Sequence, residues 1–170
     1  MVLRLHTFLF ADLVGFTQLT CERGDDEATE LAISFHGRVS ELARELGCHV
    51  VKAMGDAVMV RSESGEAAVQ LASRILRLAR AEGLPPVRVG LDTGPAVERN
   101  GDWFGATVNT ASRVTAAAGT SELLMTERTR NAAAGISGLE LAARGRHPLK
   151  GLPEQTLFGE PSCSRRTARG

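Results

Sequence analysis

Apolar positions recur at helical spacing in two long stretches of the chain. Asp25 and Asp26 are suited to begin the first helix, and Gly47 is suited to end it. Between them lies an apolar stripe with steps of three and four residues, made of Leu31, Phe35, Val39, Leu42 and Leu46. The second stretch, 66–82, repeats this spacing and stops at Gly83. The pattern therefore predicts two amphipathic helices.

Shorter apolar runs between these stretches predict β-strands. The runs cover 3–11, 50–52, 57–60, 87–91, 94–97 and 122–125. Met54-Gly55 would join the second and third runs in a tight hairpin, and Asn100-Gly101 would form a later turn. The alternation of strands and helices excludes an all-helical or all-β chain.

The C-terminal third adds smaller elements to this pattern. A third helix is predicted for 105–118 and a short one for 126–134, and 139–143 and 155–158 would form a closing hairpin. The order βαββαβ predicts an α+β sandwich of the ferredoxin-like kind, with helices on one sheet face and additional C-terminal strands. We expect one domain over 1–160 and a flexible polar tail over 161–170.

Composition excludes some classes of protein but does not indicate a particular reaction or ligand. The 170 residues include 20 Lys and Arg and 20 Asp and Glu, so the net charge is zero. This balance argues against nucleic-acid or membrane-surface binding by bulk charge. The three cysteines form no CxxC pair, and no apolar run approaches the ~20 residues of a membrane span. We expect a cytoplasmic protein that binds neither nucleic acid nor membrane.

Two aspartates follow apolar runs at predicted strand ends. Asp12 comes directly after the first run, and Asp56 follows the predicted hairpin tip. A free carboxylate at such a place is costly unless a partner compensates it, and a divalent metal would do so. Gly15 would let the backbone approach a phosphate at the start of a helix. Both aspartates are also ordinary turn or cap residues, so their spacing alone leaves both interpretations open.

A second pair of polar residues shares one face of the third predicted helix. Asn109 and Arg113 are four residues apart, so an amide and a guanidinium point the same way. Such a pair suits a sugar and a phosphate, although an exposed polar stripe has the same spacing.

Four motifs in order resemble the class III adenylyl/guanylyl cyclase catalytic domain, specifically its bacterial IIIc-like subgroup. The motifs are Phe10-Ala11-Asp12-Leu13-Val14-Gly15-Phe16-Thr17, Val51-Lys52-Ala53-Met54-Gly55-Asp56-Ala57, the run from Asp102-Trp103-Phe104-Gly105 through Asn109 to Ala111-Ser112-Arg113, and Leu149-Lys150-Gly151-Leu152. The resemblance extends over about residues 5–160. It implies the class III cyclase fold and an adenylate cyclase that makes 3′,5′-cyclic AMP and pyrophosphate.

The resemblance also implies a role for each matching residue. Asp12 and Asp56 would bind two divalent ions, Mg²⁺ or Mn²⁺, as the metal cofactors. The backbone of Leu13, Val14, Gly15, Phe16 and Thr17 would hold the β- and γ-phosphates of ATP. Lys52 and Asp102 would select the base, Asn109 would orient the ribose, Arg113 would stabilise the transition state, and Arg88 and Lys150 would contact the phosphates. The family implies a homodimer with two shared active sites.

The hydrogen-bonding inventory of the base-selecting pair favours ATP over GTP. Lys52 only donates hydrogen bonds and ionised Asp102 only accepts them, which complements N1 and the 6-amino group of adenine. Guanine presents the reverse pattern at the same edge, so donor would face donor and acceptor would face acceptor.

One position departs from the family pattern and opens a rival interpretation. Asp92-Thr93-Gly94 stands where the family often has His-Thr-Gly, and the same three residues are the short motif of aspartic proteases. Those folds are nearly all β, which disagrees with the amphipathic helices predicted here. A third alternative is a catalytically weak cyclase-like module that binds nucleotide. Metal-dependent turnover of ATP would separate the three.

Overall fold

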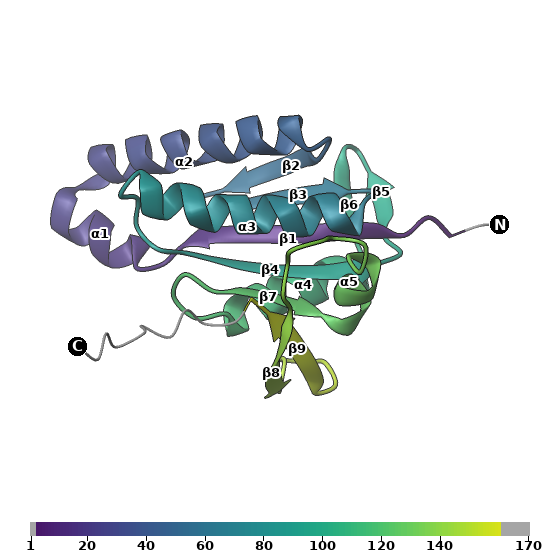
Figure 1. Ribbon diagram of the computed structural model, residues 1–170. Coiled ribbons are helices and arrows are strands. Elements are labelled where there is room, and N and C mark those ends of the chain that lie inside the picture. The colour runs from purple at the N-terminus through teal and green to yellow at the C-terminus, as the bar shows by residue number, and fades with distance from the viewer. Residues whose placement is uncertain (1–2, 161–170) are drawn as a thin grey trace, which may run out of the picture.

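The computed structural model describes residues 3–160, which form a seven-stranded sheet flanked by helices (Figure 1). Its strands are β1 (His6–Leu13), β2 (His49–Met54), β3 (Ala57–Ser62), β4 (Val87–Gly94), β7 (Leu123–Thr126), β8 (Ala142–His147) and β9 (Gln155–Gly159). The order across the sheet is β2-β3-β1-β4-β7-β9-β8. Every neighbouring pair is antiparallel except β4 and β7, so the sheet is mixed. This is the predicted α+β class, extended by strands from the C-terminal third.

Five helices and a separate hairpin complete the described chain. The helices are α1 (Phe16–Arg23), α2 (Asp25–Glu45), α3 (Gly65–Ala81), α4 (Ala106–Ala117) and α5 (Glu127–Ala132). The hairpin joins β5 (Val97–Arg99) to β6 (Asp102–Phe104) and forms its own two-stranded sheet. Within residues 3–160, no helix combines the length and the apolar character that crossing a bilayer would require.

The two long helices confirm the predictions made from their apolar stripes. In α2 the buried side chains include Phe35 and Val39, and in α3 they include Leu71 and Ile75. The Ser64 hydroxyl caps α3 by accepting a hydrogen bond of 3.1 Å from the Ala67 N–H. Both helices lie on the same face of the sheet: in Figure 1, α3 runs in front of β1 and β3, and α2 runs above it, near β2.

The prediction that the helices cover one face of the sheet is wrong for α4. Along β1, Leu9 and Ala11 join the core beneath α2 and α3, whereas Phe8 and Phe10 pack with Ala111 of α4. Because successive side chains of a strand point to opposite faces, α4 covers the other face. A run that is apolar at every position, as β1 is, is typical of a strand buried on both sides.

Three local features differ from the predicted elements. Asp102 begins the short strand β6, for which no strand was predicted, and the third helix starts at Ala106, one residue after its predicted start. No residue range was predicted for the helix that starts after Gly15, α1, because its eight residues include no buried side chain and therefore carry no apolar stripe. The closing hairpin is present, but its first strand is β8, displaced toward the C-terminus. The predicted tail, 161–170, lies outside the described residues.

Candidate active site

The two aspartates meet at one end of the central strands. Asp12 lies near the C-terminal end of β1, opposite Ala57 of β3. Asp56 occupies the turn between β2 and β3, and its carbonyl accepts a hydrogen bond of 3.3 Å from the Leu13 N–H. Burial raises the pKa of the Asp56 carboxyl above its usual range, and the nearby negative charge of Asp12 adds to the rise. The fold therefore brings the two predicted metal-binding carboxylates together.

Arg88 balances part of this negative charge. It lies opposite Asp12 in the pairing of β1 with β4, and its guanidinium bonds both carboxylate oxygens, at 2.7 Å and 3.1 Å. These hydrogen bonds raise the pKa of Arg88 above its ordinary value. The arginine predicted to contact phosphate is thus paired with a predicted metal ligand, in a bidentate geometry that fixes the orientation of that carboxylate.

The donor set at this end of the sheet fits hard divalent cations. Asp12 and Asp56 offer carboxylate oxygens, which Mg²⁺ and Mn²⁺ prefer. Within residues 3–160 there is no group of three or more His, Cys, Asp or Glu placed to hold a metal ion. Two carboxylates are nevertheless enough for Mg²⁺, which commonly keeps several waters and takes further oxygens from substrate phosphates.

A tight turn follows Asp12 and opens α1. Gly15 has a φ of 77°, in the left-handed region that favours glycine, and immediately precedes the first helical residue, Phe16. The N–H groups of Leu13 and Val14 already bond the carbonyls of Asp56 and Pro86. The N–H groups left for an anion therefore begin at Gly15, where the first turn of a helix lacks internal partners.

Lys52 and Asp102 form the second part of the site. The Lys52 ammonium lies 2.7 Å from the Asp102 carboxylate, and the Trp103 N–H donates to the other carboxylate oxygen at 2.8 Å. The hydrogen bond from Lys52 is the main reason why the pKa of Asp102 is lowered. The two residues predicted to read the base are side by side, although one lies on β2 and the other begins β6.

Asn109 and Arg113 lie on the exposed side of α4. The side of this helix that faces the sheet consists of Thr107, Thr110, Ala111, Val114 and Thr115. No ion pair or side-chain hydrogen bond within residues 3–160 connects Asn109 or Arg113 to the aspartates or to the Lys52 pair. The predicted ribose and transition-state residues share a helix face, as expected, but that face points away from the core of their own chain.

Lys150 lies in the turn that connects β8 to β9. Its neighbour Leu149 belongs to a buried cluster with Val114 of α4 and Ala118, the residue that follows this helix, and Leu152 packs against that cluster. The Lys150 side chain is exposed and has no ion-pair partner among the described residues. The turn thus lies on the same face of the sheet as Arg113.

The protease-like motif Asp92-Thr93-Gly94 is buried in the protein interior. The Asp92 side chain is 0% exposed and accepts hydrogen bonds from Thr126 at 2.6 Å and Arg128 at 2.5 Å. Burial raises the pKa of this carboxyl, and the two hydrogen bonds oppose the rise. A fully buried and bonded carboxylate cannot meet a peptide substrate, so the geometry excludes the aspartic protease interpretation.

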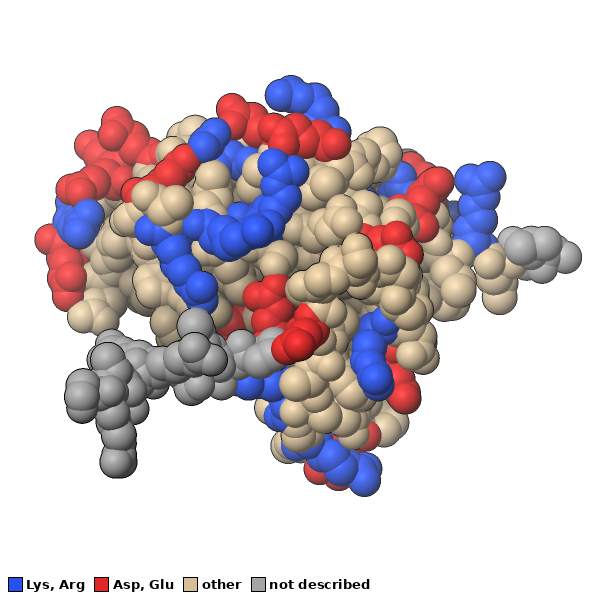
Figure 2. Space-filling view, viewed as in Figure 1, with Lys and Arg blue, Asp and Glu red and all other residues tan. Residues whose placement is uncertain are grey.

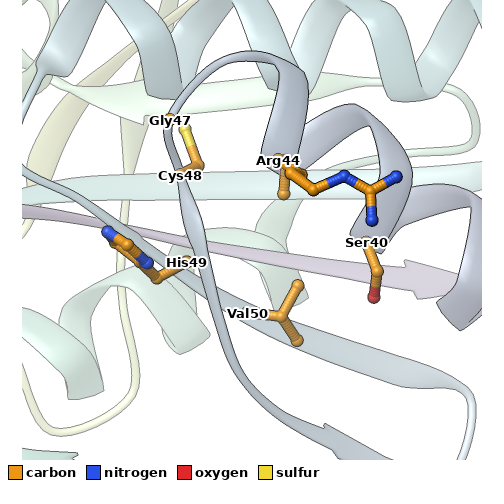
Figure 3. A pocket seen from close by; sticks show the side chains of 7 residues that line it. Ser40, Arg44, Gly47, Cys48, His49 and Val50 are labelled. Carbon is orange, nitrogen blue, oxygen red and sulfur yellow. The ribbon is translucent and has the colours of Figure 1, made fainter.

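Two surface hollows lie away from these residues. One, of about 360 Å³, lies between the C-terminal end of α2 and β2; Figure 3 shows Ser40 and Arg44 beside His49 and Val50. On the face covered by α2 and α3, Figure 2 shows basic side chains over α3. Arg74, Arg77 and Arg80 of this helix line another hollow. The candidate site is instead open to solvent on the α4 face.

One group of residues beside the site was not predicted. The rings of His6 and Trp103 lie 4.6 Å apart, and the Arg61 guanidinium lies 4.9 Å from the Trp103 ring centre. The only signal in the sequence was a lone tryptophan next to Asp102. The partners of Trp103 come from distant parts of the chain, so only the strand register reveals the cluster.

Comparison with known proteins agrees with this geometry. A family model described as the adenylate and guanylate cyclase catalytic domain matches residues 5–159. An adenylate cyclase of Streptomyces griseus is 39% identical over 119 residues, which are 69% of this chain and 30% of that protein. A pH-sensitive adenylate cyclase of Mycobacterium tuberculosis is 36% identical over 175 residues, covering 98% of this chain and 43% of that protein. The chain thus spans less than half the length of these relatives.

Solved structures show the same fold at lower identity. The adenylyl cyclase CyaB from P. aeruginosa superposes with a TM-score of 0.78 at 23% identity, covering 95% of each chain. The guanylate cyclase domain of RhGC from Catenaria anguillulae, solved in complex with GTP, gives a TM-score of 0.83 at 20% identity, with 93% of this chain and 96% of that chain covered.

Proposed function

This chain belongs to the adenylate and guanylate cyclase catalytic domain family, and from that premise we propose that it converts ATP to 3′,5′-cyclic AMP and pyrophosphate. The observation that carries the choice of ATP is the pair formed by Lys52 and Asp102, 2.7 Å apart. A donor next to an acceptor complements the adenine edge and opposes the guanine edge. The Streptomyces griseus and Mycobacterium tuberculosis relatives are adenylate cyclases, which is consistent with this choice.

The reaction is an in-line attack of the ribose 3′-hydroxyl on the α-phosphorus. Two divalent ions bound by Asp12 and Asp56 would lower the pKa of that hydroxyl and offset the charge of the leaving pyrophosphate. The backbone from Gly15 onward holds the terminal phosphates at the start of α1. Arg88, already beside Asp12, keeps that carboxylate oriented and adds positive charge near the phosphates.

The transition-state residues complete this arrangement from a second copy of the chain. Asn109 and Arg113 are exposed on α4 and form no ion pair or side-chain hydrogen bond with the other candidate residues within residues 3–160. A two-fold homodimer would bring the exposed α4 face of one copy toward Asp12 and Asp56 of the other. Asn109 would then orient the ribose, and Arg113 would meet charge at the α-phosphoryl group, contributing about 3–4 kcal/mol by analogy with oxyanion-hole donors.

Exposed apolar side chains around the base-selecting pair support this assembly. Val97 and Phe104 of the β5–β6 hairpin are 49% and 51% exposed, and Met54 at the end of β2 is 38% exposed. Strands β2 and β6 are in contact, so these side chains surround the ion pair of Lys52 with Asp102. Apolar side chains gathered in this way are typical of a surface that a partner covers.

The test is an assay of the purified protein with ATP and Mn²⁺ or Mg²⁺ that measures cyclic AMP and pyrophosphate. Asp12→Ala and Asp56→Ala should each reduce turnover to background, because each removes a carboxylate oxygen donor from the ions. Asp25→Ala, at an exposed position in the first turn of α2, is the matched control and should retain activity. Nucleotide binding without turnover in the wild-type protein would favour the weak cyclase-like module instead.

A further inference from the structure

The β5–β6 hairpin has little to hold it against the molecule. Each of its strands has three residues, and the two strands pair only with each other. An isolated two-stranded hairpin is marginally stable in water. The hairpin nevertheless carries Asp102, whose carboxylate must stay within reach of Lys52. Some other contact must therefore fix its position.

Trp103 supplies this contact through its ring. The side chain is half-buried and packs with the cluster of Phe8, Phe10, Met59 and Ala111 between the sheet and α4. Its ring centre lies 4.6 Å from that of His6 and 5.8 Å from that of Phe8, both on β1. Tilted aromatic pairs at these separations attract one another beyond the area they bury.

Arg61 closes the cluster from β3. Its guanidinium carbon lies 4.9 Å from the Trp103 ring centre, within the range of a cation–π interaction. Its Nη1 also lies 3.1 Å from Nδ1 of His6. Because arginine only donates hydrogen bonds, this Nδ1 accepts, and His6 is neutral with its proton on Nε2. Side chains from the neighbouring strands β1 and β3 thus hold the Trp103 ring in place.

We propose that Trp103, held by His6 and Arg61, is a positioning residue for base selection that keeps Asp102 opposite Lys52. This inference rests on the proposed function of the Lys52 pair. The ring of Trp103 anchors the hairpin, and its backbone N–H bonds the Asp102 carboxylate directly at 2.8 Å. The ion pair itself is 39% and 31% exposed on its two side chains, and such pairs contribute little to holding a hairpin in place.

The first experiment is a double-mutant cycle on nucleotide selectivity. In Trp103→Ala the ATP-to-GTP ratio of kcat/KM should fall by about tenfold, mainly through a higher KM for ATP, because Asp102 no longer presents its acceptor. Trp103→Phe keeps a ring and should retain most of the ratio. Asp102→Ala should lower the ratio in the wild-type background but have almost no further effect in Trp103→Ala. Fully additive effects of the two substitutions would overturn the proposal.

The second experiment needs no turnover. Amide hydrogen exchange should become faster in 97–104 of Trp103→Ala, while β1 and β4 keep their protection. Glu98→Ala, on the strand opposite Trp103, is the matched control and should exchange as the wild type does. Unchanged protection of 97–104 in Trp103→Ala would refute the anchoring role. A protein that shows this exchange pattern but no cyclase activity would instead contradict the proposed function alone.

Discussion

At the scale of single residues, the two side chains proposed to read the base form a donor–acceptor pair that can be inverted. Lys52→Glu combined with Asp102→Cys replaces the donor by an acceptor and the acceptor by a weak donor. We expect the GTP-to-ATP ratio of kcat/KM to rise by tenfold or more, at a lower overall rate, because the guanine edge then meets complementary groups. The measurement is steady-state kinetics with both nucleotides.

The single substitution Lys52→Glu is the control for this inversion. It places two carboxyl groups where the structure has an ion pair of 2.7 Å, so ATP use should fall without a matching gain in GTP use. If the double variant keeps the wild-type nucleotide ratio, these two residues do not read the base.

His6 gives the fold a dependence on pH. Burial, followed by the positive charge of Arg61, lowers the pKa of His6 below its usual value. Between that lowered pKa and about 6.5, the unfolded chain binds a proton that the folded chain excludes. The free energy of unfolding should therefore fall with decreasing pH in this window, with a slope of at most about 1.4 kcal/mol per pH unit from this group.

The measurement is chemical denaturation of the wild type and of His6→Phe between pH 7.5 and 5. His6→Phe keeps an aromatic ring beside Trp103 but has no proton to bind, so its stability should depend less on pH. His36, His49 and His147 remain in both proteins and serve as an internal control. If the free energy of unfolding depends on pH in the same way in both proteins, folding does not lower the pKa of His6.

Single residues also show how far the sequence determines a site. Asp12, Asp56 and Asp92 each follow an apolar run, and by themselves the three are indistinguishable. In the fold, the Asp92 carboxylate is buried and accepts hydrogen bonds from Thr126 and Arg128. Asp12 and Asp56 instead lie close together at an open end of the sheet. The sequence motifs assign metal binding to Asp12 and Asp56 alone, whereas the fold distinguishes Asp92 by strand register and burial, which local pattern does not determine.

At the scale of elements, the position of α4 depends on a glycine in β4. A Cβ at Gly90 would lie 2.2 Å from the Thr115 N and 2.4 Å from its Oγ1, so backbone packs on backbone here. Gly90→Ala should push α4 outward and cost about 1–3 kcal/mol of stability. Turnover should fall as well, because α4 carries Asn109 and Arg113, although neither residue is changed.

Gly37→Ala is the matched control for this prediction. Gly37 lies within α2, and a Cβ there would meet nothing within 4 Å. The substitution should stabilise the protein by about 0.5–1 kcal/mol, because glycine is a poor helix former. Thermal unfolding and kcat measured on both variants distinguish the outcomes. A Gly90→Ala protein with wild-type stability and turnover would show that the close approach of α4 is not needed.

The elements that could be predicted from sequence are those with a long or regular apolar pattern. The stripes of α2 and α3 led directly to the observed helices, and the hairpin predicted at Met54-Gly55 is present with its turn one residue later, at Gly55-Asp56. The pattern gave no indication of α1, which buries no side chain, or of β6, which is three residues long. It also could not assign α4 to a face, since β1 is apolar on both of its sides.

At the scale of the whole molecule, the two faces of the sheet differ in character. One face is closed by α2 and α3, whose outer surface carries the basic side chains visible in Figure 2. Among residues 3–160, the other is covered by α4, the β5–β6 hairpin and the turn with Lys150, and Asp12 and Arg88 lie on it. One chain therefore presents the residues assigned to metal binding and to the transition state on one face without joining them, which is the geometry a two-fold partner would complete.

A mixed dimer tests this arrangement. In the proposed homodimer, Asp12→Ala and Arg113→Ala should each be inactive alone, because each substitution spoils both sites. In a mixed dimer, which contains one copy of each variant, one site contains both substitutions and the second site contains neither. Random exchange makes about half of the dimers mixed, so activity should recover to roughly a quarter of the wild-type value if the sites act independently.

The two variants are co-expressed with different affinity tags, and tandem purification isolates the mixed dimers before cyclic AMP is measured. In the isolated mixed dimer the expected activity is about half of wild type, since one site of two is intact. Co-expression of Asp12→Ala with Asp56→Ala is the matched control. Both lesions belong to the same half of the site, so each site keeps one lesion and no activity should return. Inactive mixed dimers of Asp12→Ala with Arg113→Ala would mean that one chain supplies both residues to the same site, and the shared-site model would have to be abandoned.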